Sequence, residues 1–452
     1  MPAVSSSSRS SVRSLIASLL RIAGPVALAR LGIMGMGVTD TIVVGQLAPK
    51  ELPFLALGWA PTGVLLLTGI GLLAGVQMLT ARAVGEGNPK AAGAVWRRGI
   101  VIAVAAGAIF GVGLWLGTEP LLIGCGIAPD LARGATDVSR VLALSLPLQF
   151  AYMACSFFLE AIRRPGAATV VIWVANALNL AVNLALVPHL GAQGSAWATV
   201  AARSFMLLSL IVWILLSPSS RAHGVSERSS GAPSYRTLLG VGVAAAMSQI
   251  AEAGAFYALT VIAGRIGAQA VAAYQILLNL LAVVFMMALG LSAATAVTVS
   301  HAYGRRDLHA TARAGWIGLG LNAALMGITA AALLFGAPLI ARAFTADEEL
   351  VKLLVALIPL TALVPLPDGS QVLLASALRA RGDNWFPTAS HVVAYVLVMP
   401  PAGYILAERC GLGAAGLMQA IVAASILSVG VLLARWWNLA GGLASFSFFS
   451  RR

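Results

Sequence analysis

The stretch SPSSRAHGVSERSSGAPS, residues 217–234, divides the chain into two halves. It is the longest polar stretch in the 452 residues, and its Ser, Gly and Pro content is typical of a flexible linker. On both sides of it the sequence consists of long apolar blocks, separated by short charged or Gly/Pro-containing connections. The sequence therefore predicts two sets of apolar segments joined by one polar linker.

The composition excludes a soluble globular protein. Hydrophobic residues make up 59% of the chain and charged residues only 10%, whereas soluble domains carry about 25% charged residues. The apolar residues form long blocks instead of short alternating segments, which also excludes a β-barrel. We expect an all-α polytopic membrane protein whose twelve transmembrane helices form two six-helix bundles. The predicted helices are 15–44, 52–81, 92–116, 138–162, 167–188, 193–216, 237–264, 270–302, 311–340, 350–378, 386–407 and 412–436.

The positive charges predict the orientation. Of the 29 Lys and Arg residues, 20 fall on the side of the linker, seven fall on the opposite side, and Arg30 and Arg203 lie within predicted helices. This asymmetry is a strong positive-inside signal, so we expect a multi-pass protein of the cell (inner) membrane with both termini in the cytoplasm. The basic residues behind the net charge of +13 lie mainly in the short connections between apolar blocks. They form no pattern typical of a nucleic-acid-binding surface, so no nucleic acid partner is expected.

The halves resemble each other. We expect an amino-terminal lobe at 1–216, a cytoplasmic linker at 217–235, a carboxy-terminal lobe at 236–436 and a cytoplasmic tail at 437–452. Three glycines recur with one offset of 219 residues: Gly45, Gly71 and Gly85 correspond to Gly264, Gly290 and Gly304. Since six helices is an even number, a duplicated six-helix unit would relate the two lobes by an axis along the membrane normal.

Three acidic residues lie inside predicted helices: Asp40, Glu252 and Asp368. An ionisable group at membrane depth is costly unless it is paired or lines a wet cavity, so each is a candidate for binding a coupling cation or proton. Each also has a structural alternative. Asp40 and Glu252 could be interfacial residues, and Asp368 could cap a helix after the break caused by Pro365 and Pro367.

Several polar residues share helical faces with these carboxylates. A helix that is broken beside a carboxylate suits a small hard cation, so a Na⁺ site at Glu252 and Asp368 is a candidate. Three asparagines on one face are more typical of a wet cavity than of contacts between helices. The candidate substrate-binding or cavity-lining residues are Asn176, Asn179, Asn183, Gln249, Phe256 and Gln371.

Two other charged residues have simpler interpretations. Arg30 either pairs with a carboxylate or extends toward the membrane surface. Glu160 precedes Arg163 and Arg164 at a helix end, which favours a surface charge pair. The five histidines form no ligand cluster and no nucleotide-binding motif is present, so neither catalytic residues nor ATP-driven transport are expected.

Three segments resemble the multidrug and toxic compound extrusion (MATE) transporters, in particular the NorM-like branch. They are MGMGVTDTIVVGQL (34–47), the segment from QIAEAG to SHAYG (249–304), and PDGSQVLLASALRARGD (367–383). The resemblance covers the chain from about Ser14 to Arg435. It implies two bundles facing a central cavity, and export of organic, often cationic, compounds in exchange for Na⁺ or H⁺, with no other cofactor.

By motif position, the resemblance places Asp40 at the amino-lobe carboxylate of the family, and Glu252 and Asp368 at the carboxy-lobe cation site. One departure matters, because Val364 stands where NorM-like members have an aromatic hydroxyl. A lipid-linked saccharide flippase is the alternative within the superfamily, and an integral-membrane transferase is an alternative from another class. A monomer with small organic substrates is expected.

Overall fold

The computed structural model describes residues 12–227 and 231–440, and within these ranges every regular element is helical. The predicted tail at 437–452 therefore lies outside the described residues from 441 onward. In the amino-terminal half the helices are α1 (Val12–Leu47), the short turn η1 (Pro49–Glu51), α2 (Leu52–Gly85), α3 (Pro89–Gly124), α4 (Pro129–Ala161), α5 (Gly166–Leu216) and α6 (Pro218–Arg221).

The carboxy-terminal half follows the linker. It contains α7 (Tyr235–Ile266), α8 (Ala268–Gly304), α9 (Leu308–Phe344), α10 (Glu348–Thr361), α11 (Pro365–Ala380), α12 (Trp385–His391), η2 (Val392–Val398), α13 (Met399–Tyr404), η3 (Ile405–Arg409) and α14 (Gly413–Leu439). The elements from α12 to η3 form one continuous apolar helix, Trp385–Arg409, in which η2 and η3 are π-helical turns.

The element α5 consists of two helices that meet at a sharp kink, and each is one membrane pass. It is 51 residues long, and Gly191 interrupts it with φ 55° and ψ −135°. In a straight helix Asn183 and Thr199 would lie about 24 Å apart, yet both donate hydrogen bonds to Asp40, at 2.8 Å each. The chain therefore reverses at Gly191, between the predicted helices 167–188 and 193–216.

The predicted helix 350–378 is interrupted as its prolines indicated. Its two parts, α10 and α11, meet at a bend of 46° after Thr361. The largest boundary error concerns the fourth helix, which begins at Pro129 instead of 138. A proline fits the first turn of a helix, where its missing N–H has no partner to lose.

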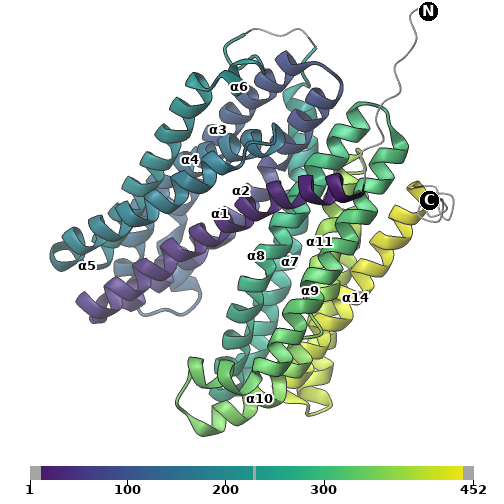
Figure 1. The fold of residues 1–452 in the computed structure, drawn as a ribbon. Coiled ribbons are helices and arrows are strands. Elements are labelled where there is room, and N and C mark those ends of the chain that lie inside the picture. Colours follow the sequence, from purple (N-terminus) through teal and green to yellow (C-terminus); the bar gives the residue numbers. More distant parts are fainter. Residues whose placement is uncertain (1–11, 228–230, 441–452) are drawn as a thin grey trace, which may run out of the picture.

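These elements give twelve membrane passes in two lobes, which confirms the predicted fold class. The amino lobe comprises α1–α5 and the carboxy lobe α7–α14. Figure 1 shows the lobes adjacent at the end where α1 begins and α6 lies, and diverging toward the loops near α10. We call these the convergent end and the divergent end.

The hydrophobic cores explain this shape. One core joins both lobes and includes Leu73 and Val95 of the amino lobe together with Val241 and Leu378 of the carboxy lobe. Nearer the divergent end each lobe has a core of its own, one around Leu142 and the other around Leu277. The lobes are therefore held together by apolar contacts at the convergent end only.

Recurring glycines form the contact between the lobes. A Cβ at Gly71 of α2 would lie 2.5 Å from Cα of Ala246 on α7, and one at Gly290 of α8 would lie 2.7 Å from the Ala23 carbonyl oxygen on α1. These contacts are equivalent under exchange of the lobes, as expected for a duplicated unit. Only a residue without a Cβ permits backbones to approach so closely.

The linker is held more tightly than its composition suggests. Arg97 of α3 donates to the carbonyl oxygens of Gly224 (2.8 Å) and Val225 (2.6 Å), and Arg98 donates to that of Ala232 (2.9 Å). Lys90 forms an ion pair with Glu227 at 2.8 Å. The described part of the linker is thus tied to the start of α3, because Arg97 and Arg98 supply donors for backbone carbonyls that no helix satisfies.

Candidate functional site

The amino-lobe site is built where α1 packs closely against α5. Gly32 of α1 makes this possible, because a Cβ there would lie 2.9 Å from Ile172 of α5. Two turns further along α1, Asp40 is completely buried. Its Oδ1 accepts hydrogen bonds from Asn179 (3.1 Å) and Asn183 (2.8 Å), and its Oδ2 accepts one from Thr199 (2.8 Å). Three neutral donors thus compensate one carboxylate.

The predicted asparagine face divides into two parts. Asn179 and Asn183 reach Asp40, whereas Asn176 donates to the backbone carbonyl of Gly32 at 2.9 Å and joins α5 to α1. Asn179 and Asn183 are both fully buried, so they lie inside the lobe and do not line an open cavity in this state. Their contacts support a role in setting the environment of Asp40.

Sequence reasoning missed two members of this site. Thr199 gave no signal, because the predicted break between 188 and 193 does not show which side chains of the following helix face Asp40. Arg203, noted only as a charge within a helix, is 4% exposed and interacts electrostatically with Asp40. Its guanidinium donates to Ser145 at 2.6 Å and lies over the Trp59 ring, 5.4 Å from the centroid.

The carboxy-lobe site brings Glu252 and Asp368 together. Both are nearly buried, at 7% and 8% exposed, and the two carboxylates interact electrostatically between α7 and α11. Asp368 Oδ1 accepts hydrogen bonds from Tyr395 (3.2 Å), Ser425 (3.3 Å) and Gln371 (3.5 Å). Glu252 Oε2 and Gln371 Oε1 have no hydrogen-bond partner among the described residues.

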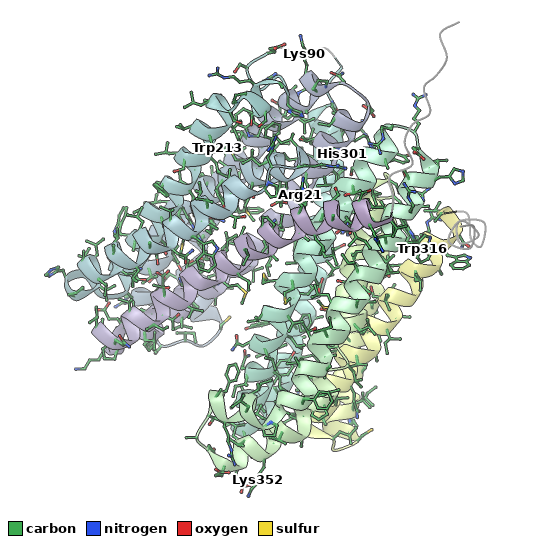
Figure 2. All side chains as sticks on the ribbon, in the orientation of Figure 1. Arg21, Lys90, Trp213, His301, Trp316 and Lys352 are labelled. Atoms are coloured by element: carbon green, nitrogen blue, oxygen red, sulfur yellow. The ribbon has the colours of Figure 1, made fainter. Side chains whose placement is uncertain are left out.

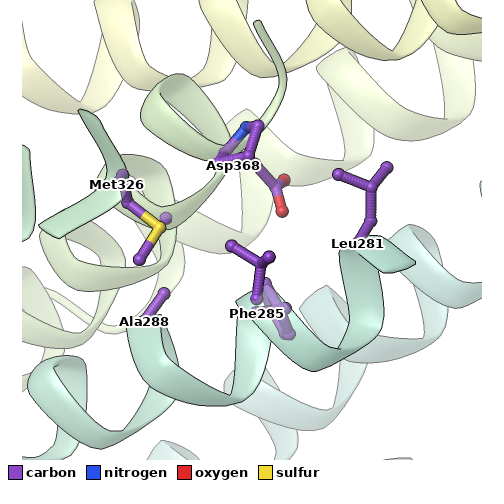
Figure 3. A pocket seen from close by; sticks show the side chains of 8 residues that line it. Leu281, Phe285, Ala288, Met326 and Asp368 are labelled. Carbon is purple, nitrogen blue, oxygen red and sulfur yellow. The ribbon is translucent and has the colours of Figure 1, made fainter. Parts of the chain in front are cut away.

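The pocket beside Asp368 is large enough for one small ion only. Figure 3 shows its carboxylate pointing toward a pocket lined by Leu281, Phe285 and Met326. The volume of this pocket is about 10 Å³, close to the lower limit for a single water molecule. The site therefore accommodates a small ion or a proton, and no organic substrate.

Tyr395 supplies the hydroxyl that Val364 cannot. It lies on the π-helical turn η2, 27 residues after Asp368, and is fully buried. Because a hydroxyl oxygen is both donor and acceptor, it can bond to a carboxylate or turn its lone pairs to a cation. The sequence could not reveal this substitution, since Tyr395 comes from a different helix.

The other predicted carboxy-lobe residues lie less centrally. Gln249 and Phe256 are half-buried on α7, and Phe256 packs against the core of the carboxy lobe. Arg379, which sequence reasoning did not select, is 8% exposed and interacts electrostatically with Glu252. Its Nη2 donates to Ser248 at 2.5 Å.

Glu160 is not part of a surface charge pair. The prediction was wrong, because Glu160 is 2% exposed and faces α1, where its Oε1 lies 3.5 Å from Nη2 of Arg30. Gln77 donates to Oε2 at 2.5 Å and Ser156 to Oε1 at 3.1 Å. This pair resolves the two alternatives for Arg30 in favour of a carboxylate partner.

The residue after Glu160 also contacts the other lobe. The carbonyl oxygen of Ala161 lies 2.8 Å from His301 Nε2 of α8. Figure 2 marks His301 in the region where the lobes meet. This contact joins the end of α4 to α8 at the convergent end.

Twelve passes in two related lobes, with a site built on buried carboxylates in each lobe, are typical of a membrane transporter. Comparison with known proteins identifies the family. The model of the MatE family matches residues 25–185 and 244–405, which fall in the two lobes. The chain belongs to the MatE family, that is, to the MATE transporters.

The similar proteins are of the NorM type. The chain is 41% identical over 438 residues to a probable multidrug resistance protein NorM of Caulobacter vibrioides, covering 92% of this chain and 90% of that protein. It is 30% identical to a probable NorM of Pseudomonas aeruginosa, covering 94% and 86%. These matches confirm the resemblance to NorM-like transporters.

Solved structures share the fold over nearly the whole chain. The eukaryotic MATE transporter AtDTX14 has a TM-score of 0.85 at 18% identity, covering 95% of this chain and 98% of that one. A MATE multidrug resistance transporter described as outward-facing has a TM-score of 0.83 at 18% identity, covering 93% and 96%. The two-lobed architecture is therefore the family architecture.

Proposed function

We propose that this protein is a secondary active multidrug efflux antiporter of the cell (inner) membrane. It exports organic, often cationic, compounds and takes up Na⁺ or H⁺ in exchange. Both termini face the cytoplasm, the protein works as a monomer, and no cofactor other than the coupling ion is needed. The NorM relatives are described as multidrug resistance proteins, which supports this substrate class.

The observation that carries the proposal is the pair of buried carboxylate sites, one in each lobe. Burying a carboxylate in a membrane protein costs several kcal/mol unless it serves transport or is fully paired. Asp40 accepts hydrogen bonds from three neutral donors and interacts with Arg203 electrostatically, with no ion-pair contact between them among the described residues. Glu252 and Asp368 interact electrostatically with each other, and Asp368 also lines an ion-sized pocket. Two such carboxylates repel each other unless a cation or a proton lies between them.

The arginines buried inside the amino lobe argue against a saccharide flippase. A carrier of an anionic lipid-linked sugar needs uncompensated positive charge at the depth of the membrane. At that depth Arg30 pairs with Glu160, and Arg203 interacts electrostatically with Asp40. Asp40, Glu252 and Asp368 also lie on three helices in two lobes, which supports a transporter over a transferase.

Transport in everted vesicles tests the proposal. Vesicles containing the protein are assayed with a fluorescent organic cation, first with a Na⁺ gradient alone and then with a pH gradient alone. We expect substrate accumulation driven by one of the two gradients. Accumulation that requires ATP, or that neither gradient drives, would contradict the proposal.

Two conservative substitutions test the carboxy-lobe site. Glu252→Gln and Asp368→Asn should each abolish gradient-driven transport, and the double variant should lose little more, because members of one site are not additive. Glu348→Gln, an exposed carboxylate on α10 of the same lobe, is the matched control. Partial losses that add up would indicate two unrelated structural carboxylates.

A further inference from the structure

A second, polar cavity lies at the convergent end, and neither Asp40 nor Asp368 is among its lining residues. Its volume is about 250 Å³, and its lining includes Arg82, Thr237, Arg379, Asn384 and Trp385. Arg82 belongs to α2 of the amino lobe, and the other four belong to the carboxy lobe. The cavity is therefore formed between the lobes and exists only while they are in contact.

The lining is positively charged. Its ten residues include two arginines and no Asp or Glu. Arg379 is 8% exposed, and its Nε has no hydrogen-bond partner among the described residues. The Nε atom of Arg82 is likewise without a partner there. Such buried donors cost free energy unless a ligand or water satisfies them.

The charges around the cavity leave Arg82 uncompensated. Arg82 lies over the Tyr303 ring at 4.6 Å and donates Nη2 to the carbonyl oxygen of Ala380 at 3.3 Å, and neither partner is an acid. Asp383 is next to the cavity, but its carboxylate pairs with Arg435 at 2.8 Å. Of the two cavity arginines, only Arg379 interacts electrostatically with Glu252.

We propose that this cavity binds a phosphate group, either on a lipid headgroup or as a free phosphate. Two guanidinium groups with unused donors fit the oxygens of a phosphate, which arginine binds through paired hydrogen bonds. Thr237 and Asn384 add a hydroxyl and an amide. A volume of about 250 Å³ holds the group together with several waters.

The cavity lies at helix ends near the membrane surface, where both a lipid headgroup and free phosphate can reach it. Arg379 lies one residue before the end of α11, Thr237 is the third residue of α7, and Trp385 is the first residue of α12. Trp385 is 55% exposed. Tryptophan beside arginine at helix ends is typical of the headgroup layer, which lipid phosphates and soluble phosphate both reach.

A bound phosphate would also favour the present state. Because it contacts Arg82 of one lobe and Arg379 of the other, separating the lobes at this end would split its site. A ligand that binds one of two states more tightly shifts the equilibrium toward that state. Phosphate binding should therefore hold the convergent end closed.

Two native cysteines provide the measurement. Cys125 follows α3 in the amino lobe and Cys410 follows η3 in the carboxy lobe, and both are exposed, whereas Cys155 is buried. Both lie at the divergent end. Spin labels on Cys125 and Cys410 thus report the distance between the lobes there without engineered sites.

The experiment uses the full chain in micelles of a glycoside detergent, which contains no phosphate. In one arm, inorganic phosphate is titrated against chloride at constant ionic strength. In the other, phosphatidylglycerol is added to the micelles. We expect at least one ligand to increase the population with the long Cys125–Cys410 distance. A response to phosphate alone identifies the soluble anion, a response to lipid alone identifies the headgroup, and both outcomes support the site.

The arginine variants test whether the response comes from this cavity. Arg82→Gln should weaken the apparent affinity about tenfold or more, the loss expected for a charge-assisted hydrogen bond, and Arg82→Lys should recover part of it. Arg305→Gln removes an exposed charge at the same end and should bind normally. If neither ligand changes the distance, or if Arg82→Gln responds like the unmodified protein, the proposal is wrong.

Discussion

At the scale of single residues, the two carboxylate sites differ in what surrounds them. Asp40 is enclosed by the amide and hydroxyl donors of Asn179, Asn183 and Thr199. Asp368 shares its site with a second acid, Glu252, and with an ion-sized pocket. The first arrangement suits one group that changes its protonation, and the second suits a cation held between two acids.

Asp40→Asn should bind substrate weakly and without pH dependence. Asparagine imitates the neutral carboxyl group, so the variant stays in the form that we expect to release substrate. Exchange can be driven by protonation only if the two forms bind substrate with different affinity. Substrate affinity is measured in detergent across about pH 5 to 8, the range in which folded proteins are usually most stable.

Asp137→Asn is the matched control, since Asp137 is exposed and pairs only with Arg140. It should keep the affinity and pH dependence of the unmodified protein. If Asp40→Asn behaves in the same way as this control, then Asp40 is structural and protons enter elsewhere.

Tyr395→Phe should change binding of the coupling ion in a direction that distinguishes H⁺ from Na⁺, while leaving the fold intact. The change removes the hydroxyl that donates to Asp368 and keeps the ring. This hydrogen bond stabilises the ionised, empty carboxylate by about 1.5–3 kcal/mol, so the proton concentration for half-maximal transport should fall at least roughly tenfold if H⁺ is the coupling ion. If the coupling ion is Na⁺, the variant lacks one oxygen ligand and the Na⁺ concentration for half-maximal transport should rise. Tyr274→Phe is the control, because that hydroxyl bonds to the backbone of Phe256 at 3.3 Å. Equal behaviour of the two variants would show that Tyr395 only fills space.

At the scale of elements, α2 and α8 determine how the lobes meet. Their glycines Gly71 and Gly290 occupy equivalent positions, and each packs against the backbone of a helix in the other lobe. Backbone atoms cannot move aside as a flexible side chain can, so the closeness of the lobes depends on the absence of a side chain at these positions.

Gly71→Ala should shift the protein away from the state in which the convergent end is closed. Its Cβ would lie 2.5 Å from Cα of Ala246, and overpacking of this kind costs about 1–3 kcal/mol. The label pair on Cys125 and Cys410 should then show a larger population with the short distance. Gly63→Ala lies on the same helix with no atom within 4 Å and should change nothing. Matching distance distributions for the two variants would contradict this account.

At the scale of the whole molecule, the first described helix begins and the last one ends on the side of the molecule that the positive charges assign to the cytoplasm. The linker, the start of α1 and the end of α14 all lie at the convergent end, where the lobes are in contact (Figure 1). If that end faces the cytoplasm, as the positive charges predict, the state described here is open to the outside.

A reporter fused after Ser226 tests this orientation. We expect an enzyme active only in the cytoplasm to be active at this position, because an even number of passes precedes it. A second fusion after Lys50, in the connection between α1 and α2, should give the opposite result. A periplasmic signal at Ser226 would contradict both the pass count and the orientation.

The sequence by itself determined the class of fold, the positions of twelve passes, the break before Asp368 and three carboxylates that the structure buries. These depend on local properties: the length of apolar blocks, proline chemistry and the cost of burying a charge. The sequence could not place residues from different helices side by side. It therefore missed Thr199 beside Asp40 and Tyr395 beside Asp368, and it assigned Glu160 to the surface.

Only the tertiary structure decided these contacts, because they depend on which faces of the helices meet and how closely the helices approach. The reversal at Gly191 brings Thr199 back to Asp40, and the packing of α1 on α4 pairs Arg30 with Glu160. The cavity between Arg82 and Arg379 likewise exists only where two lobes meet. The length and position of apolar segments can be read from the sequence alone, whereas the pairing of buried polar groups depends on three-dimensional packing.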